Sequence, residues 1–188
     1  MGDPKKFKKK YNTPAHPWNK QAIETEGILR KEYGLKKKKE IYIASSFLKK
    51  YKDIAKRLIA DTSTQGAKEG QQMTAKLQRL GLLQTSAKLD HVLSLELKDV
   101  LERRLQSLVC RKGLAKTMNQ ARQFITHRHV MIGDKEITSP AYLTSLQEEA
   151  VLMFHERSAL KSSDHPERTA AAVSATAASS EAKVEAAA

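Results

Sequence analysis

The chain contains one cysteine, few aromatic residues and no long apolar run. Because Cys110 is the single cysteine, an internal disulfide is excluded, and a cysteine-based zinc site would lack its ligands. We therefore expect a reducing, cytoplasmic setting. We expect Cys110 to be a small core residue. No apolar segment approaches the ~20 residues of a membrane span. The N-terminus has no apolar signal core, so secretion is not expected.

Acidic residues are scarce relative to basic ones, and the positive charge is unevenly distributed. The 34 Lys and Arg outnumber the 21 Asp and Glu, which gives a net charge of +13. Residues 1–60 hold 17 basic and 6 acidic side chains, and residues 101–131 hold 7 and 1. This excess predicts a polyanionic partner. Nucleic acid is the commonest such partner, and an anionic membrane surface is the alternative.

Changes in composition divide the chain into four parts. Residues 1–18 form a basic, proline-containing arm, which we expect to order on RNA rather than to remain a solvated tail. Residues 19–100 are expected to form a helical domain, and residues 101–165 a compact module. Residues 166–188 are an alanine-rich tail without an apolar stripe, expected to be disordered or transiently helical. The predicted class is α+β, with a helical domain and a module of two helices and a short antiparallel sheet.

The helical domain is predicted from apolar spacing and from end signals. Asn19 and Gly34 bracket a helix over 19–33, because Asn caps a helix start and Gly favours positive φ after its end. A second helix is expected over 38–60 and a third over 67–80. The buried side of the second helix is expected to include Ala44, Phe47, Leu48, Tyr51, Ile54, Ala55, Leu58 and Ile59. Its other side carries Lys49, Lys52, Lys56 and Arg57, which fits a solvated surface and an RNA contact equally well.

The module is predicted to begin with a helix over 98–109. Leu101, Leu105, Leu108 and Val109 face inward in that helix, so that Arg103, Arg104 and Gln106 point outward or to the rim. Thr117 begins the next helix, and the Thr-x-x-Gln spacing to Gln120 is typical of a capping box. Gly133 and Asp134 turn a hairpin between strands at 130–132 and 135–137. Further strands are expected at 142–143 and 151–154, with Glu148 and Glu149 in the turn between them.

The second module helix is the predicted RNA-binding surface. Its N-terminal N–H groups and Lys116 suit a phosphate, and a row of basic and amide side chains can contact phosphate, sugar and base edges. We expect RNA contact or packing, rather than metal binding, from the two histidines at its end. The predicted RNA-binding residues are Arg103, Arg104, Arg111, Lys112, Lys116, Thr117, Gln120, Arg122, Gln123, His127, Arg128 and His129. A secondary set comprises Lys5, Lys6, Lys8, Lys9, Lys10, Lys36, Lys37, Lys38, Lys39, Lys49, Lys52, Lys56 and Arg57.

These residues carry a resemblance to a known family. The stretch LERRLQSLVCRKGLAKTMNQARQFITHRHV, followed by a hairpin and Ser139-Pro140, resembles the S4-type RNA-binding module of a small-subunit ribosomal protein. The segments GDPKKFKKKYNTPAHPW, EYGLKKKKEI and KLQRLGLL are similar to the archaeal form, so the resemblance covers residues 1 to about 160. Many such modules have glycine where this chain has Arg128. If φ is positive there, arginine costs on the order of 1 kcal/mol.

The resemblance implies a non-enzymatic protein that binds small-subunit ribosomal RNA early in assembly and nucleates the subunit body. It also implies contacts with neighbouring ribosomal proteins, a place where messenger RNA enters the subunit, and an influence on decoding accuracy. No cofactor and no metal are expected. One alternative is an RNA-modifying or tRNA-linked enzyme with the same module, but the sequence has no phosphate-cradling glycine loop and no catalytic constellation. A DNA-compacting or membrane-bound protein would leave Thr117, Gln120 and Gln123 unexplained.

Overall fold

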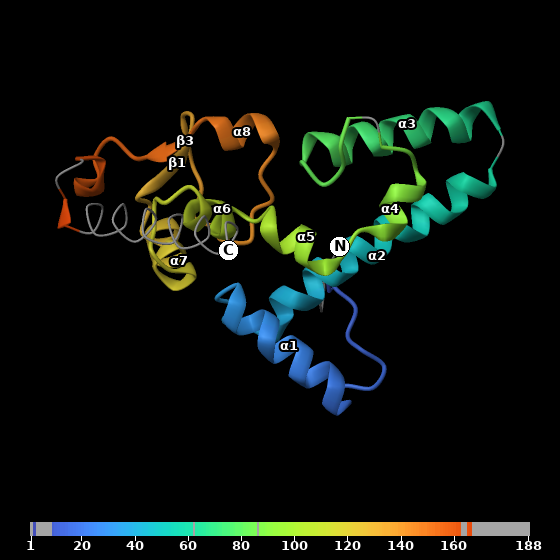
Figure 1. Ribbon diagram of the computed structural model, residues 1–188, viewed down its shortest axis with the longest axis horizontal. Coiled ribbons are helices and arrows are strands. Elements are labelled where there is room, and N and C mark those ends of the chain that lie inside the picture. Colours follow the sequence, from blue (N-terminus) through green and yellow to red (C-terminus); the bar gives the residue numbers. More distant parts are fainter. Residues whose placement is uncertain (1, 3–8, 62, 86, 163–164, 167–188) are drawn as a thin grey trace, which may run out of the picture. The chain divides into compact units, whose positions relative to one another are not determined.

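Figure 1 shows the computed structural model, which describes residues 2, 9–61, 63–85, 87–162 and 165–166. The chain divides into two compact units, the helical unit (residues 1–78 and 82–101) and the module (residues 79–81 and 102–188). Three predicted RNA contacts, Lys5, Lys6 and Lys8, lie outside the described residues. The predicted tail, apart from Pro166, also lies outside them.

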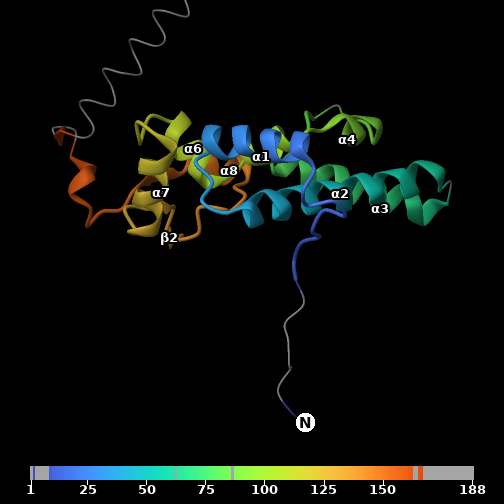
Figure 2. The ribbon, with the colours of Figure 1, turned by 90° about the horizontal axis from the view of Figure 1, so that it is seen from below.

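The helical unit is built on the long helix α2 (Lys38–Ala60). It also contains α1 (Lys20–Glu32), α3 (Thr64–Arg79), α4 (Asp90–Ser94) and the start of α5 (Leu97–Glu102). The predicted ends of α1 are confirmed, because the Asn19 side chain accepts a hydrogen bond from the Gln21 N–H at 3.1 Å and Gly34 has a φ of 58°. Figure 1 shows α3 turning back from the end of α2, with α4 lying between the two helices, and Figure 2 shows the same helices from below.

The core of the helical unit lies where α2, α3 and α4 meet. Tyr51, Ala55 and Leu58 of α2 pack with residues of α3 and α4, and Leu77 and Val92 are completely buried. The prediction of a buried Ile59 is wrong, since 45% of that residue is exposed. Ile59 follows Leu58 at the end of α2, where the apolar stripe has already turned away from the core.

The module packs two helices against one side of a small sheet. α6 (Leu105–Arg111) and α7 (Met118–Thr126) are followed by β1 (Val130–Ile132), β2 (Lys135–Glu136), α8 (Leu146–Ala150), β3 (Leu152–Phe154) and the short helix η1 (Ala159–Lys161). The strand order is β2-β1-β3, and both pairings are antiparallel. The predicted hairpin is confirmed, with Gly133 at a φ of 56°. The core joins Leu105 and Val109 of α6 to Ile125 of α7 and to the inward side chains of β1 and β3.

The prediction of one continuous helix over 98–109 is wrong, because the helix is interrupted between the end of α5 at Glu102 and the start of α6 at Leu105. Arg104 adopts an extended backbone with φ −72° and ψ 143° and forms a β-bridge with Leu143. The N–H of Leu105 then donates to the Tyr142 carbonyl at 2.8 Å. This pairing with a segment almost forty residues later replaces helical hydrogen bonds at the break. The strand predicted at 142–143 is reduced to that isolated bridge.

The acidic pair predicted in a turn lies instead in α8. Ser145 caps this helix, and a full capping box joins its side chain and N–H to Glu148. The Ser145 N–H is the main cause that lowers the pKa of Glu148, and the Tyr142 hydroxyl also donates to that carboxylate at 2.7 Å. Two reciprocal hydrogen bonds stabilise even a five-residue helix at its start.

Cys110 lies at the edge of the module core. It is half-buried and packs against the apolar cluster, and burial raises the pKa of its thiol. A raised pKa keeps the thiol protonated, which fits the predicted packing role.

Across the described ranges, no helix combines the length and the apolar character that crossing a membrane requires.

Candidate nucleic-acid interface

The start of α7 is organised by Thr117, as the sequence predicts. Its hydroxyl accepts a hydrogen bond from the Gln120 N–H at 3.2 Å. The Gln120 side chain accepts from the N–H of Lys116 at 2.8 Å rather than from that of Thr117, so the predicted capping box is shifted by one residue. Lys116 is exposed beside this helix start. A helix N-terminus with an exposed lysine next to it is a favourable place for a phosphate.

One side of α7 is packed into the module and the other side is open. Ala121 and Ile125 are completely buried. Gln123 and His127 are exposed, and Gln120 and Arg122 are half-buried. The predicted row of Lys116, Gln120, Gln123 and His127 therefore lies along the side of the helix away from the core. We name these four residues, with Arg122 and Arg128, the α7 surface.

Arg128 ends α7 in a left-handed conformation. Its φ of 62° is the only positive φ among the non-glycine residues of the described part of the chain. The N–H groups of Arg128 and His129 donate to the carbonyls of Ile125 and Phe124 at 3.1 and 2.9 Å, which closes the helix end. Glycine usually occupies this position because an L side chain there costs about 1 kcal/mol. The strain expected from the sequence is therefore present, and the charged side chain is exposed.

Two substitutions of Arg128 distinguish the effect of its backbone strain on stability from the effect of its charge on RNA binding. Arg128→Gly is expected to raise the free energy of unfolding by about 0.5–1 kcal/mol, because glycine relieves the strained φ. Arg128→Ala retains the strain and is expected to stay within about 0.5 kcal/mol of the unchanged protein. Both should weaken RNA binding to the same extent. Denaturant unfolding and filter binding measure the two effects, and equal stabilities of the two variants would show that the conformation is unstrained.

The two histidines beside Arg128 differ in their surroundings. His127 is exposed, whereas His129 is half-buried and its Nδ1 lies 2.9 Å from the Ser158 hydroxyl. Their rings stack at a centroid distance of 6.4 Å, and Phe124 meets His129 edge-on. No group of three possible metal ligands occurs within the described residues. His129 is thus held by packing, and His127 is the histidine that solvent can reach.

The first arginines of the module do not point outward as expected. Arg103 is half-buried, and its Nη1 lies 2.7 Å from the Glu149 carboxylate, while Lys112 donates to the carbonyl of the same glutamate. Gly81, at a φ of 70°, lies so close that an added Cβ would be 3.0 Å from the Arg103 guanidinium carbon. Arg104 is only 4% exposed. The prediction that these side chains point outward or to the rim is wrong for Arg104, which the break between α5 and α6 places in the interior, whereas Arg103 is half-buried.

Gln106 was also expected at the rim and is buried, with 1% of its surface exposed. Its Nε2 donates to the Met118 carbonyl at 2.8 Å, and its Oε1 accepts from Nη1 of Arg122 at 3.5 Å. A buried amide in α6 thus contacts both the first turn of α7 and a cation of the α7 surface. Helical periodicity did not reveal this role, because the break before α6 changes which side of the helix faces the core.

Arg111 is the last residue of α6 and one of the predicted RNA contacts. Its guanidinium lies 2.6 Å from the Glu102 carboxylate, and 51% of its side chain is exposed. An exposed ion pair of this kind contributes about 0–1 kcal/mol to stability, so a phosphate can replace the carboxylate at little cost. Arg111 and Lys112 are exposed at the end of α6, beyond the buried apolar side of that helix.

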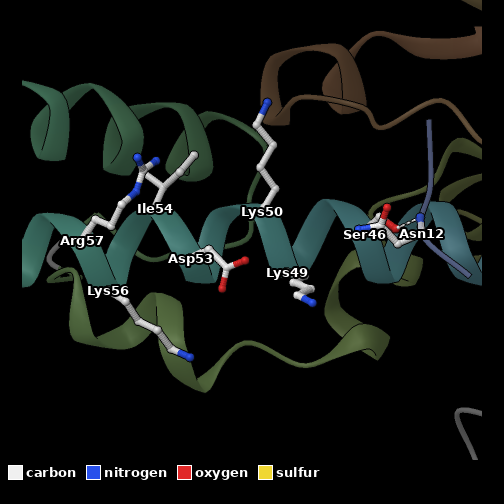
Figure 3. Close-up of a pocket in the computed structure, with 8 residues that line it drawn as sticks. All are labelled: Asn12, Ser46, Lys49, Lys50, Asp53, Ile54, Lys56 and Arg57. Carbon is white, nitrogen blue, oxygen red and sulfur yellow. Dashed lines mark hydrogen bonds between the residues drawn. The ribbon is translucent and has the colours of Figure 1, made fainter. Parts of the chain in front are cut away.

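The secondary lysines are largely exposed in the helical unit. Lys9, Lys10, Lys36, Lys37 and Lys39 are exposed, and Lys38 lies 3.2 Å from Glu26. Figure 3 shows Lys49 and Lys56 on one side of α2 and Arg57 on another. As predicted, Lys49, Lys56 and Arg57 are all exposed and lie away from the buried side of α2, whereas Lys52 is half-buried.

Comparison with known proteins identifies the family. The chain is 48% identical over 172 residues to the small ribosomal subunit protein uS4 of Methanococcus maripaludis strain C5, covering 91% of this chain and 97% of that protein. It is 49% identical over 170 residues to the uS4 protein of Methanococcus aeolicus, covering 90% and 96%. The chain belongs to the uS4 family. The resemblance to the archaeal form is confirmed.

The profile of the S4 domain matches residues 103–149 of this uS4-family chain. Its two ends, Arg103 and Glu149, form the ion pair described above. The match also contains the α7 surface. The uS4 relatives are named as ribosomal proteins rather than as enzymes. That finding favours the non-enzymatic interpretation over an enzyme with an accessory S4 domain.

Proposed function

We propose that this protein is a structural constituent of the small ribosomal subunit that binds small-subunit ribosomal RNA directly. Residues 101–165 would act as the main RNA-binding module, and the lysines of residues 19–100 as a second contact. The observation that carries the proposal is the α7 surface, where exposed basic and amide side chains surround a capped helix start within the S4 domain match. Such side chains contact phosphates and sugars as well as base edges.

The predicted RNA-binding residues take different parts in this proposal. Those placed on or near open surface make the direct contacts: Arg111, Lys112, Lys116, Thr117, Gln120, Arg122, Gln123, His127 and Arg128. Arg103, Arg104 and His129 are half-buried or buried and support that surface from within. We assign them to positioning, because Arg103 is paired with Glu149, Arg104 is 4% exposed and His129 lies against the Ser158 hydroxyl.

The wider role follows from membership of the uS4 family. We propose that the protein nucleates assembly of the subunit body, contacts neighbouring small-subunit proteins and contributes to translational accuracy from a place where messenger RNA enters. The cytoplasmic ribosome is the corresponding location. No cofactor enters this proposal.

Salt dependence of binding tests the direct RNA contact. If Lys116, Arg122 and Arg128 each neutralise one phosphate, the log–log slope of the binding constant against salt should be about −2 to −3 from these residues alone. Filter binding to small-subunit ribosomal RNA between low and moderate salt measures the slope. An unrelated RNA of equal length is the control for specificity. A flat salt dependence, or equal affinity for both RNAs, would refute a specific phosphate-contacting interface.

A further inference from the structure

Two adjoining cavities run along α2 in the helical unit. The first has a volume of about 500 Å³, and the second, between residues 12–15, α1 and α2, about 600 Å³. Asn12, Ser46 and Lys49 line both of them. The shared residues make the two cavities neighbours on the surface of α2, and we name the pair the α2 groove.

The wall of the α2 groove is fixed by contacts of the N-terminal segment. The Asn12 N–H donates to the Ser46 hydroxyl at 2.9 Å, as the dashed line in Figure 3 shows. Tyr11 stacks on Tyr42 at a centroid distance of 6.3 Å, and the Lys39 ammonium lies 5.6 Å from the Tyr11 ring. The segment is thus attached to α2 at successive residues, and the groove exists before any ligand binds.

The two ends of the α2 groove differ in chemistry. The first cavity is lined by Lys49, Lys50, Lys56 and Arg57 against the single acid Asp53. Figure 3 shows Lys49 and Lys56 extending to the same side of α2. One end of the groove therefore carries a strong excess of positive charge, which suits a phosphate.

The second cavity is mostly apolar with hydroxyl groups at its surface. Leu29 and Ile41 line it together with Thr25, Ser45 and the Tyr42 ring. Its acid, Glu26, is already paired with Lys38 at 3.2 Å. An apolar floor with a few hydroxyls and one aromatic ring is the usual lining for a flat, partly polar ring such as a nucleobase.

We propose that the α2 groove binds a short unpaired stretch of RNA, with backbone phosphates at Lys49 and Lys56 and one base in the second cavity. This inference rests on the proposed function and names a contact that the module does not provide. The net charge of residues 1–60, with 17 basic and 6 acidic side chains, favours RNA over an acidic protein segment of similar shape. Bases that are not paired are the ones a protein pocket can accept.

Filling the second cavity tests whether a base enters it. Ser45→Trp places a large side chain on the exposed surface of α2 at the cavity, and Ile43→Trp places the same side chain on α2 outside the groove. Ser45→Trp is expected to weaken binding of small-subunit ribosomal RNA about 10-fold, since a stacked base contributes roughly 1–3 kcal/mol. Its salt slope should stay unchanged, because no charge is altered. Ile43→Trp should bind like the unchanged protein.

Removing charge tests the other end of the groove. Lys49→Gln with Lys56→Gln should reduce the magnitude of the log–log salt slope by about 0.7–1.4, the value for one or two phosphates of a single strand. Lys68→Gln with Lys98→Gln removes the same charge from exposed positions outside the groove and should leave the slope unchanged. Thermal unfolding of all four proteins checks that each is folded.

The outcomes separate this inference from the proposed function. If Ser45→Trp binds RNA as well as Ile43→Trp does, no base enters the cavity and the inference is wrong, even if the lysine variant loses affinity. If the groove variants bind RNA normally but fail to enter small subunits, the occupant is a protein and the inference is again wrong. If the unchanged protein does not bind the ribosomal RNA specifically, the proposed function itself fails.

Discussion

Replacing Lys116, Arg122 and Arg128 together by glutamine is expected to weaken binding to small-subunit ribosomal RNA by more than about 100-fold. All three belong to the α7 surface, and charge-assisted hydrogen bonds to phosphate contribute about 1.5–3 kcal/mol each. Lys116 and Arg128 are exposed, and Arg122 is half-buried against Gln106. The unfolding temperature should change by less than about 6 °C, because substitutions at the surface rarely exceed 0.5 kcal/mol each.

A matched triple variant controls for the loss of net charge. Lys135, Arg157 and Lys161 are exposed in the same module but lie outside α7, in β2 and after β3. Exchanging these three for glutamine removes the same charge and should reduce affinity only a few-fold. If both triple variants lost affinity equally, binding would depend on overall charge, and the α7 surface would have no special role.

The second large effect concerns stability. Arg104→Ala is expected to destabilise the protein by about 3 kcal/mol, because truncating a long buried side chain removes its packing contacts and opens a cavity. This arginine is 4% exposed and stands at the break where Leu143 pairs with it. A loss of that size lowers the unfolding temperature by roughly 6–12 °C.

Arg111→Ala is the control, since it removes the same side chain from an exposed ion pair with Glu102. Its expected cost is below about 1 kcal/mol. Calorimetry of both variants measures the difference. If Arg104→Ala unfolded at the temperature of the unchanged protein and lost only RNA affinity, Arg104 would be an RNA ligand, as its position in the sequence first indicated.

Local signals in the sequence were sufficient to predict several of the helices and the hairpin. The apolar spacing and the end signals predicted α1, α2 and α7, because a cap such as Asn19 or Thr117 acts on its own helix. The hairpin around Gly133 was predicted for the same reason, since its turn requires positive φ. The capping-box spacing of Ser145 and Glu148 was also present in the sequence and could have revealed α8.

The break between α5 and α6 could not be read from nearby residues. Arg104 leaves the helical conformation because it pairs with Leu143, and no periodic pattern reports a partner so far along the chain. Missing this break also led to wrong predicted orientations for two side chains of the module. A continuous helix would turn Arg104 and Gln106 outward, whereas the observed break places both in the interior. The α7 surface was predictable because its helix has no such break.

Crosslinking within purified small ribosomal subunits tests the central claim most directly. The protein should co-sediment with the small subunit, and mass spectrometry should find RNA-crosslinked peptides from residues 116–128 and from α2. Peptides from β2 should not carry RNA. Absence of the protein from small subunits, or RNA crosslinks confined to the sheet side of the module, would contradict the account.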